Sequence, residues 1–206
     1  MSIVTYNNRS IANISAIPGA AESLTHIKTL TASSSANLSF VDGSSDVVLD
    51  NTYPIYVFKF INIHPATDGA QFKFNLSADT GSNYNVAKTT TFFKAYHNEA
   101  GSATSLTYEA SDDLAQGTGS QFLSSVIDND NDACWDGTMH LFNPSSTTFV
   151  KHFISVGASL GASTYSYNDF VAGYGNTTSA VDAVQFTMSS GNIDAGTIKL
   201  YGIKDS

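Results

Sequence analysis

The densest group of side chains able to do chemistry is the acidic run that begins at Asp128. Carboxylates alternate at Asp128, Asp130 and Asp132, with asparagines between them. Ca²⁺ takes about six to eight oxygen ligands from a flexible loop, so these three carboxylates are candidates to converge on one calcium ion. The run lacks the glycine and the late glutamate of an EF-hand loop. A solvated acidic turn between two strands is the alternative interpretation.

Aromatic residues form the second group of candidates. Trp135 follows the acidic run, and Tyr165, Tyr167 and Tyr174 lie among asparagines and small residues in a segment that we expect to be loop-like. Exposed aromatic rings beside amides suit a sugar, whose ring stacks on the aromatic face while amides bond its hydroxyls. Subunit interfaces are enriched in the same residues. The pattern predicts an interface or a glycan contact, with structural packing as the alternative.

Motifs for catalysis are missing from the sequence. None of the five histidines lies two or four residues from another, and Cys134 is the single cysteine. No Gly-x-Ser-x-Gly nucleophile elbow occurs, and no glycine-rich phosphate loop precedes a helix. We therefore expect a protein that is not an enzyme and that needs no cofactor, apart from the calcium considered above.

Charge and composition narrow the function classes further. The 206 residues include nine Lys and Arg against eighteen Asp and Glu, a net charge of -9, so a nucleic-acid partner is not expected. The apolar runs are too short for membrane insertion. The amino end lacks the basic start and continuous apolar stretch of a signal peptide, and one cysteine allows no internal disulfide. Synthesis in the cytoplasm is the resulting expectation.

Period-two alternation of apolar and polar residues dominates the chain. It is present in Gln71–Leu76, Phe149–Ile154 and Val184–Met188. Tyr56–Ile61 is apolar on both sides except at Lys59, which is typical of a central strand. Further strands are predicted at His26–Ala32, Leu38–Val41, Val47–Leu49, Thr91–Tyr96, Leu106–Tyr108, Phe122–Ile127, Met139–Phe142, Asp169–Tyr174 and around Ile198–Leu200.

These short strands, separated by turn dipeptides such as Asp-Gly and Asn-Pro, predict an all-β fold: an antiparallel, jelly-roll-like β-sandwich. We assign residues 25–206 to this single domain. Residues 1–24 lack strong alternation and are interpreted as an extended N-terminal arm for attachment or packing, with a frayed terminus as the alternative.

The closing segment Met188–Ile203 contains Gly196-Thr197-Ile198-Lys199-Leu200-Tyr201-Gly202. It resembles the carboxyl ends of virion structural proteins from tailed bacteriophages, notably marine and cyanobacterial phages, which finish on a strand of the form Gly-Thr-x-x-Leu-Tyr-Gly. The segment from His140 to His152 is similar in character. The resemblance implies a sandwich carried on the tail, a fibre or the capsid surface, commonly as a trimer. It transfers no catalytic residues.

The sequence thus favours a virion structural protein, made in the host cytoplasm, that belongs to the tail, a fibre or the baseplate. Its expected partners are other copies of itself in a trimer, other virion proteins and host surface glycans. A capsid decoration protein is the alternative within this class. A lectin-like carbohydrate-binding module, assisted by calcium at the acidic run, and a small hydrolase with dispersed catalytic residues are the alternatives outside it.

Overall fold

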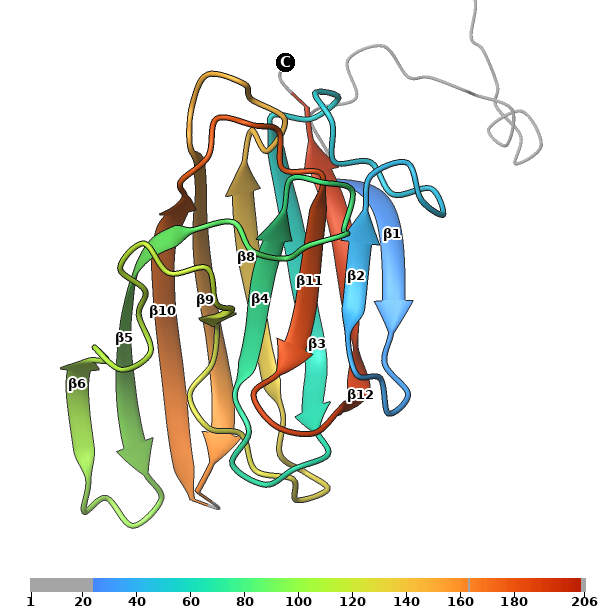
Figure 1. The fold of residues 1–206 in the computed structure, drawn as a ribbon. Coiled ribbons are helices and arrows are strands. Elements are labelled where there is room, and N and C mark those ends of the chain that lie inside the picture. Colours follow the sequence, from blue (N-terminus) through green and yellow to red (C-terminus); the bar gives the residue numbers. More distant parts are fainter. Residues whose placement is uncertain (1–23, 163, 205–206) are drawn as a thin grey trace, which may run out of the picture.

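The computed structural model describes residues 24–162 and 164–204, which form two antiparallel β-sheets packed face to face (Figure 1). Twelve strands and no helix occur in this part of the chain. The strands are β1 (Thr25–Thr31), β2 (Leu38–Val41), β3 (Ile55–Pro65), β4 (Phe72–Ser77), β5 (Lys88–Asn98), β6 (Thr104–Tyr108), β7 (Gln121–Phe122), β8 (Trp135–Phe142), β9 (Lys151–Gly161), β10 (Tyr165–Gly175), β11 (Ala183–Met188) and β12 (Ile193–Ile203).

The large sheet has eight strands in the order β1-β12-β3-β8-β9-β10-β5-β6, and the small sheet has four in the order β2-β11-β4-β7. The predicted all-β sandwich is confirmed. The chain moves repeatedly between the two sheets, as it does in jelly rolls, and the jelly-roll assignment stays a prediction. The predicted N-terminal arm lies outside the described residues, except for Leu24.

Alternation explains how the strands form. In β9 the inward side chains Lys151 and Phe153 are buried, whereas the intervening His152 and Ile154 are exposed. The pleat sends neighbouring side chains to opposite faces, so one face of the strand joins the core and the other faces solvent.

Three predictions about strands were wrong. The run Val47–Leu49 is not a strand, and the predicted strand Phe122–Ile127 is reduced to the two residues of β7. The segment around Tyr165, expected to be a loop, is the first half of β10. The strand at Val47–Leu49 was predicted from local apolar content. Val47 and Leu49 are indeed buried, but the segment does not pair as a strand.

Aromatic side chains fill the space between the sheets. Phe186 of the small sheet contacts Phe58, Phe60 and Phe72, with ring centroids 5.1–5.7 Å apart. All four side chains are almost fully buried. Aromatic pairs in edge-to-face and offset arrangements add to the free energy gained from removing the rings from water. This cluster binds the small sheet to the middle of the large one.

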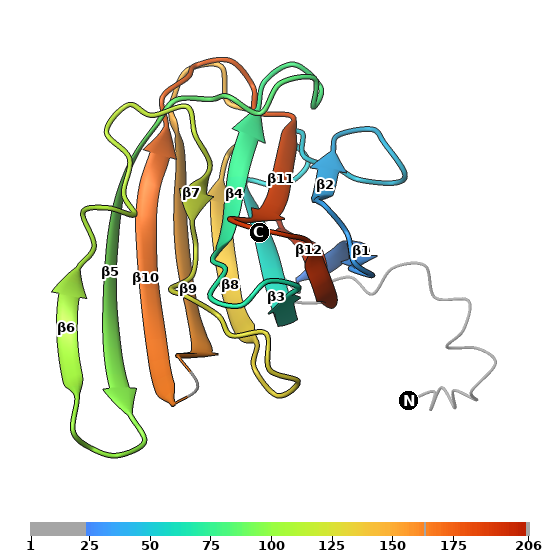
Figure 2. The ribbon, with the colours of Figure 1, turned by 60° about the horizontal axis from the view of Figure 1, so that its bottom comes forward.

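The small sheet covers only part of the large sheet. Strands β5 and β6 project beyond it at one edge, together with the lower ends of β9 and β10 (Figures 1 and 2). In this region the long connection between β6 and β8 crosses the inner face of the large sheet. The strands β5, β6, β9 and β10 are therefore accessible on their outer face and, at the end of the sandwich, on their inner face.

Candidate contact surfaces

Strand β10 supplies side chains to two different surfaces. Tyr165, Tyr167 and Asp169 point to the inner face of the large sheet, whereas Phe170 and Ala172 belong to the outer face. The two neighbours of β10 are β9 and β5, and both pair with it along its full length. Side chains from three strands therefore align in rows on each face.

The outer face carries a row of apolar side chains. Phe93 pairs with Phe170 across β5 and β10, and the two rings stack with centroids 4.9 Å apart and an interplanar angle of 5°. Tyr108 of β6 extends the row at one end, and Val156 of β9 extends it at the other. We call this row and its apolar neighbours the outer strip, which consists of Phe93, Leu106, Tyr108, Ile154, Val156 and Phe170.

The outer strip is exposed to an unusual degree. Leu106 is 71% exposed, Tyr108 55% and Ile154 49%. A shallow apolar groove of about 200 Å³ runs between Phe93, Ile154 and neighbouring side chains. Because an aromatic side chain presents about 150–250 Å² and an aliphatic one somewhat less, the strip leaves on the order of 500 Å² of apolar surface in water. The largest apolar patch on a typical monomer is of about this size, and such a patch is often functional.

The inner face carries a second group of aromatic residues. Tyr96, Tyr165 and Tyr167 form a triangle in which each pair of ring centroids is 5.8–6.0 Å apart. Lys94 Nζ is 5.5 Å from the centre of the Tyr167 ring and 3.3 Å from Glu109 Oε1. We call these five residues the tyrosine site. Burial and the neighbouring Tyr165 raise the pKa of Tyr167.

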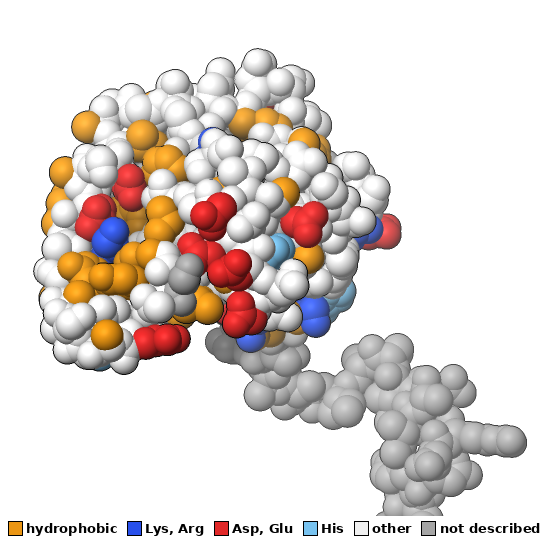
Figure 3. Space-filling model, turned by 90° about the horizontal axis from the view of Figure 1, so that it is seen from below, with side chains coloured by type: hydrophobic (Ala, Val, Ile, Leu, Met, Phe, Trp, Pro, Cys, Tyr) orange, Lys and Arg blue, Asp and Glu red, His pale blue; other side chains and the backbone are white. Residues whose placement is uncertain are grey.

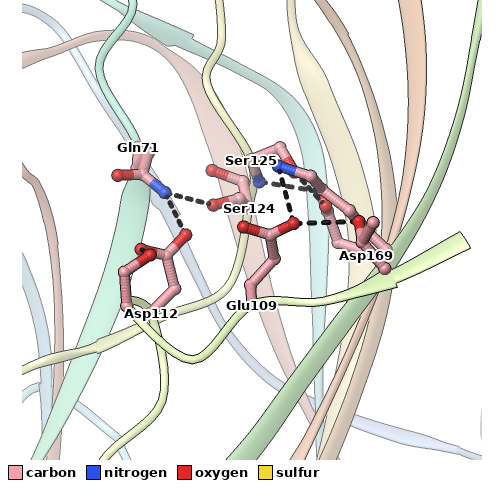
Figure 4. Close-up of polar contacts among 9 residues, drawn as sticks. Gln71, Glu109, Asp112, Ser124, Ser125 and Asp169 are labelled. Atoms are coloured by element: carbon pink, nitrogen blue, oxygen red, sulfur yellow. Dashed lines mark hydrogen bonds and ion pairs between the residues drawn. The ribbon is translucent and has the colours of Figure 1, made fainter. Parts of the chain in front are cut away.

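A buried carboxylate lies next to the tyrosine site. Asp169 is fully buried, and its two carboxylate oxygens accept hydrogen bonds from the backbone N–H and the hydroxyl of Ser125, at 3.0 and 2.6 Å. Burial raises the pKa of Asp169 to about 6, although the hydrogen bonds from Ser125 and the charge of Lys94 act in the opposite direction. The contact ties the β7–β8 connection to β10 (Figure 4).

The connection between β6 and β8, which borders the tyrosine site, is held by further polar contacts. Gln71 directly precedes β4, and its Nε2 donates to Asp112 Oδ2 at 2.9 Å and to the carbonyl of Ser124 at 3.3 Å (Figure 4). Thr107 Oγ1 donates to Glu109 Oε1 at 2.9 Å. Glu109, at the start of this segment, is therefore held by Thr107 as well as by Lys94, and it presents a fixed carboxylate.

The structure brings together only some of the predicted contact residues. Tyr165 and Tyr167 lie side by side in the tyrosine site. Tyr174 belongs to the opposite face of β10, where its ring centroid is 5.9 Å from that of His152. The predicted group of three tyrosines is thus divided, because Tyr174 follows the other two by nine and seven positions, and an odd offset along a strand places side chains on opposite faces.

Trp135 is not a surface residue. Its side chain is fully buried, and its indole lies across Gly137 and Gly157, where a Cβ would approach the ring to 2.6 and 2.3 Å. The prediction that Trp135 contacts a glycan or a subunit is corrected: the indole occupies core space that only these two glycines leave open.

The acidic run does not form the predicted calcium site. Asp128 is buried, and its Oδ1 accepts a hydrogen bond from the backbone N–H of Ala162 at 2.8 Å. Asp130 and Asp132 are exposed. No group of three or more His, Cys, Asp or Glu side chains that could hold a metal ion occurs within residues 24–162 and 164–204. The carboxylates separate because Asp128 is directed at the β9–β10 turn.

A polar hollow of about 420 Å³ lies beside the acidic run, lined in part by Asn62, His64 and Cys134. Burial and the nearby Asp136 raise the pKa of the Cys134 thiol to about 11. His64 Nδ1 is hydrogen-bonded to the carbonyl of Ala133 at 2.7 Å. The thiol is therefore protonated at neutral pH and is not activated as a nucleophile.

Sequence reasoning missed Phe93, Lys94 and Tyr96. The alternation of Thr91–Tyr96 places Phe93 on one face and the other two on the opposite face, so their separation was open to inference. The contact of these three residues with β10 could not be inferred from the sequence, because β5 and β10 are more than sixty residues apart along the chain.

Comparison with known proteins does not assign the chain. No family model, curated protein or solved structure matches it. Among the described residues there is also no helix capable of crossing a membrane. The outer strip and the tyrosine site are therefore the basis on which a function can be proposed.

Proposed function

We propose that this chain is a non-enzymatic virion structural protein that assembles with other copies of itself through the outer strip. The exposed apolar surface of Phe93, Ile154 and their neighbours carries this proposal. Apolar patches of this size on an ordered sheet are unfavourable in water, and covering them by a partner releases that cost. A tail, fibre or baseplate component is the placement favoured by the resemblance of the closing strand.

The size of the strip fits a contact between subunits. About 500 Å² of apolar surface on each partner, with a polar rim, approaches the roughly 800 Å² per partner of a standard interface. The strip itself consists of uncharged side chains. Copies that carry a net charge of -9 repel one another at long range. The strip contains no carboxylate, so contact between two strips does not bring carboxylates of the strip together.

Light scattering coupled to size-exclusion chromatography tests the assembly. We expect the wild-type chain to form an oligomer, a trimer in our proposal, and Ile154→Lys to shift it to the monomer. Phe149→Ser is the matched control, because Phe149 is 70% exposed but lies outside the outer strip. A wild-type monomer at the highest soluble concentration, or equal effects of the two substitutions, would contradict assembly through this face.

Placement in a virion needs a separate measurement. Mass spectrometry of purified phage particles should detect the chain in a stoichiometric amount, and particles separated into tails and capsids should carry it with the tails. Recovery with the capsid shell would favour the decoration alternative. Complete absence from purified particles would refute the virion assignment while leaving the assembly result unaffected.

A further inference from the structure

The same strands present chemically different surfaces on their two faces. The outer strip is made of phenylalanine, aliphatic side chains and one tyrosine. The inner face has three tyrosines, together with a lysine and a glutamate in contact with each other. An aliphatic surface is suited to another protein surface, whereas tyrosines with charged hydrogen-bonding groups suit a ligand that is apolar on its ring face and polar at its edge.

The tyrosine site has hydrogen-bonding capacity that the protein does not use. The hydroxyls of Tyr96, Tyr165 and Tyr167 make no hydrogen bond to any other residue in the described ranges. Their rings are half-buried, so their positions are restrained while part of each ring remains accessible. A tyrosine of this kind presents an aromatic face and a free hydroxyl at little cost in side-chain entropy.

The charged pair adds a donor and an acceptor at one edge of the rings. Lys94 and Glu109 are 20% and 22% exposed, so both can reach a ligand in the site. Their distance of 3.3 Å makes the pair neutral overall. Seen from below, this end of the molecule has hydrophobic side chains, a class that includes tyrosine, gathered around a hollow next to acidic side chains (Figure 3).

We propose that the tyrosine site binds a neutral saccharide. One pyranose ring stacks on the accessible part of Tyr165, because the Tyr167 ring is already in contact with Lys94 and Tyr165. Two neighbouring hydroxyls bond Lys94 Nζ and Glu109 at the same time. Carboxylate and ammonium groups form stronger hydrogen bonds with hydroxyls than neutral groups do. An anionic sugar is disfavoured, because the chain is acidic and Glu109 already neutralises the lysine. This inference does not depend on assembly through the outer strip.

An immobilised array of neutral and acidic oligosaccharides tests the proposal with the full chain as probe. We expect a subset of the neutral oligosaccharides to bind, and the strongest of them is then titrated by calorimetry. Tyr165→Ala should weaken that binding by at least about tenfold, which corresponds to about 1.4 kcal/mol. Lys94→Met should weaken it similarly, because it removes the donor and leaves the Glu109 carboxylate without its cationic partner.

Tyr174→Ala is the matched control. It removes a half-buried tyrosine from the same strand but from the opposite face, so it should leave saccharide affinity unchanged. Thermal melts identify variants that fail to fold, and Tyr165→Phe, which keeps the ring, serves in place of a misfolded alanine variant: it should bind measurably more weakly, through loss of one hydroxyl.

Several outcomes overturn the proposal. They are an array with no bound neutral oligosaccharide, binding of acidic sugars alone, and equal losses in Tyr165→Ala and Tyr174→Ala. Loss of oligomerisation instead of sugar binding in Tyr165→Ala would identify the tyrosine site as a subunit contact. The Ile154→Lys variant separates the two proposals, because a folded monomer that still binds the sugar supports the saccharide site whatever the role of the outer strip.

Discussion

Replacement of Asp169 by asparagine should change how stability depends on pH. The buried carboxylate has a pKa of about 6 in the folded protein against a reference value of 3.8. Between about pH 4 and pH 6 the native state keeps the proton that the unfolded chain has released, so stability falls as pH rises through this window. A difference of about two pKa units corresponds to about 3 kcal/mol, lost in full by about pH 7.

Asparagine preserves the shape and both contacts. Its carbonyl oxygen can accept the hydrogen bond from the backbone N–H of Ser125, and its amide can donate to the Ser125 hydroxyl, which rotates to accept it. Asp169→Asn has no carboxylate to ionise. We therefore expect the variant to gain stability over the wild type as pH rises from about 4, up to about 3 kcal/mol by about pH 7. The wild-type carboxyl keeps a proton that the unfolded chain releases and, above about pH 6, carries a buried charge, whereas the asparagine does neither.

Urea denaturation followed by the fluorescence of Trp135, the single tryptophan, measures both unfolding free energies across this range. The difference between the two curves cancels the titration of all other groups. Asp130→Asn, in the exposed acidic run, controls for the change in net charge. A difference curve for Asp169→Asn that is flat from about pH 4 to pH 7, or one that falls with rising pH, would refute the reasoning.

Three other substitutions or reactions test the structure. Gly157→Ala should destabilise the fold by about 2–4 kcal/mol in urea, because its Cβ would overlap the Trp135 ring, whereas Gly119→Ala, with open space around it, should change stability little; equal effects would contradict the packing described. Burial lowers the pKa of Lys88 to about 8, so wild-type stability should rise between about pH 8 and pH 10.5 relative to Lys88→Met by about 3 kcal/mol, and parallel denaturation curves for the two proteins would disprove this. Cys134, with its pKa raised to about 11, should react with iodoacetamide at about pH 8 on the order of tens of times more slowly in the folded protein than in urea, as followed by intact mass; similar rates would show an accessible thiolate.

Alternation predicted most of the strands and the face of each side chain within them. It assigned Phe72 and Phe74 to one face of β4, and the structure buries both. It failed where turn signals and apolar content suggested a strand without a partner to pair with, as at Val47–Leu49. It also failed at Tyr165 and Tyr167, where polar neighbours indicated a loop but pairing with β5 and β9 produced a strand.

The candidate sites depended far more on the tertiary structure. The acidic run attracted attention because three carboxylates alternate in sequence, yet the fold turns Asp128 inward and leaves the others in solvent. The opposite happened at the tyrosine site, which no sequence motif indicated: Tyr96 meets Tyr167 through the pairing of β5 with β10, and Glu109 joins them through its ion pair with Lys94. Trp135, expected at the surface, fills core space above two glycines that come from neighbouring strands.

By itself the sequence determined the secondary structure class, the acidic and thiol-poor character of the chain, and the two faces of each strand, because the pleat alternates side chains locally whatever the strand's neighbours are. Only the tertiary structure decided which strands became neighbours, and therefore which side chains share a surface. Strand pairing is a long-range property, set by how the two sheets bury the aromatic core together. Phe93 and Phe170 stack on one face, and Tyr96 and Tyr167 meet on the other, for that reason alone.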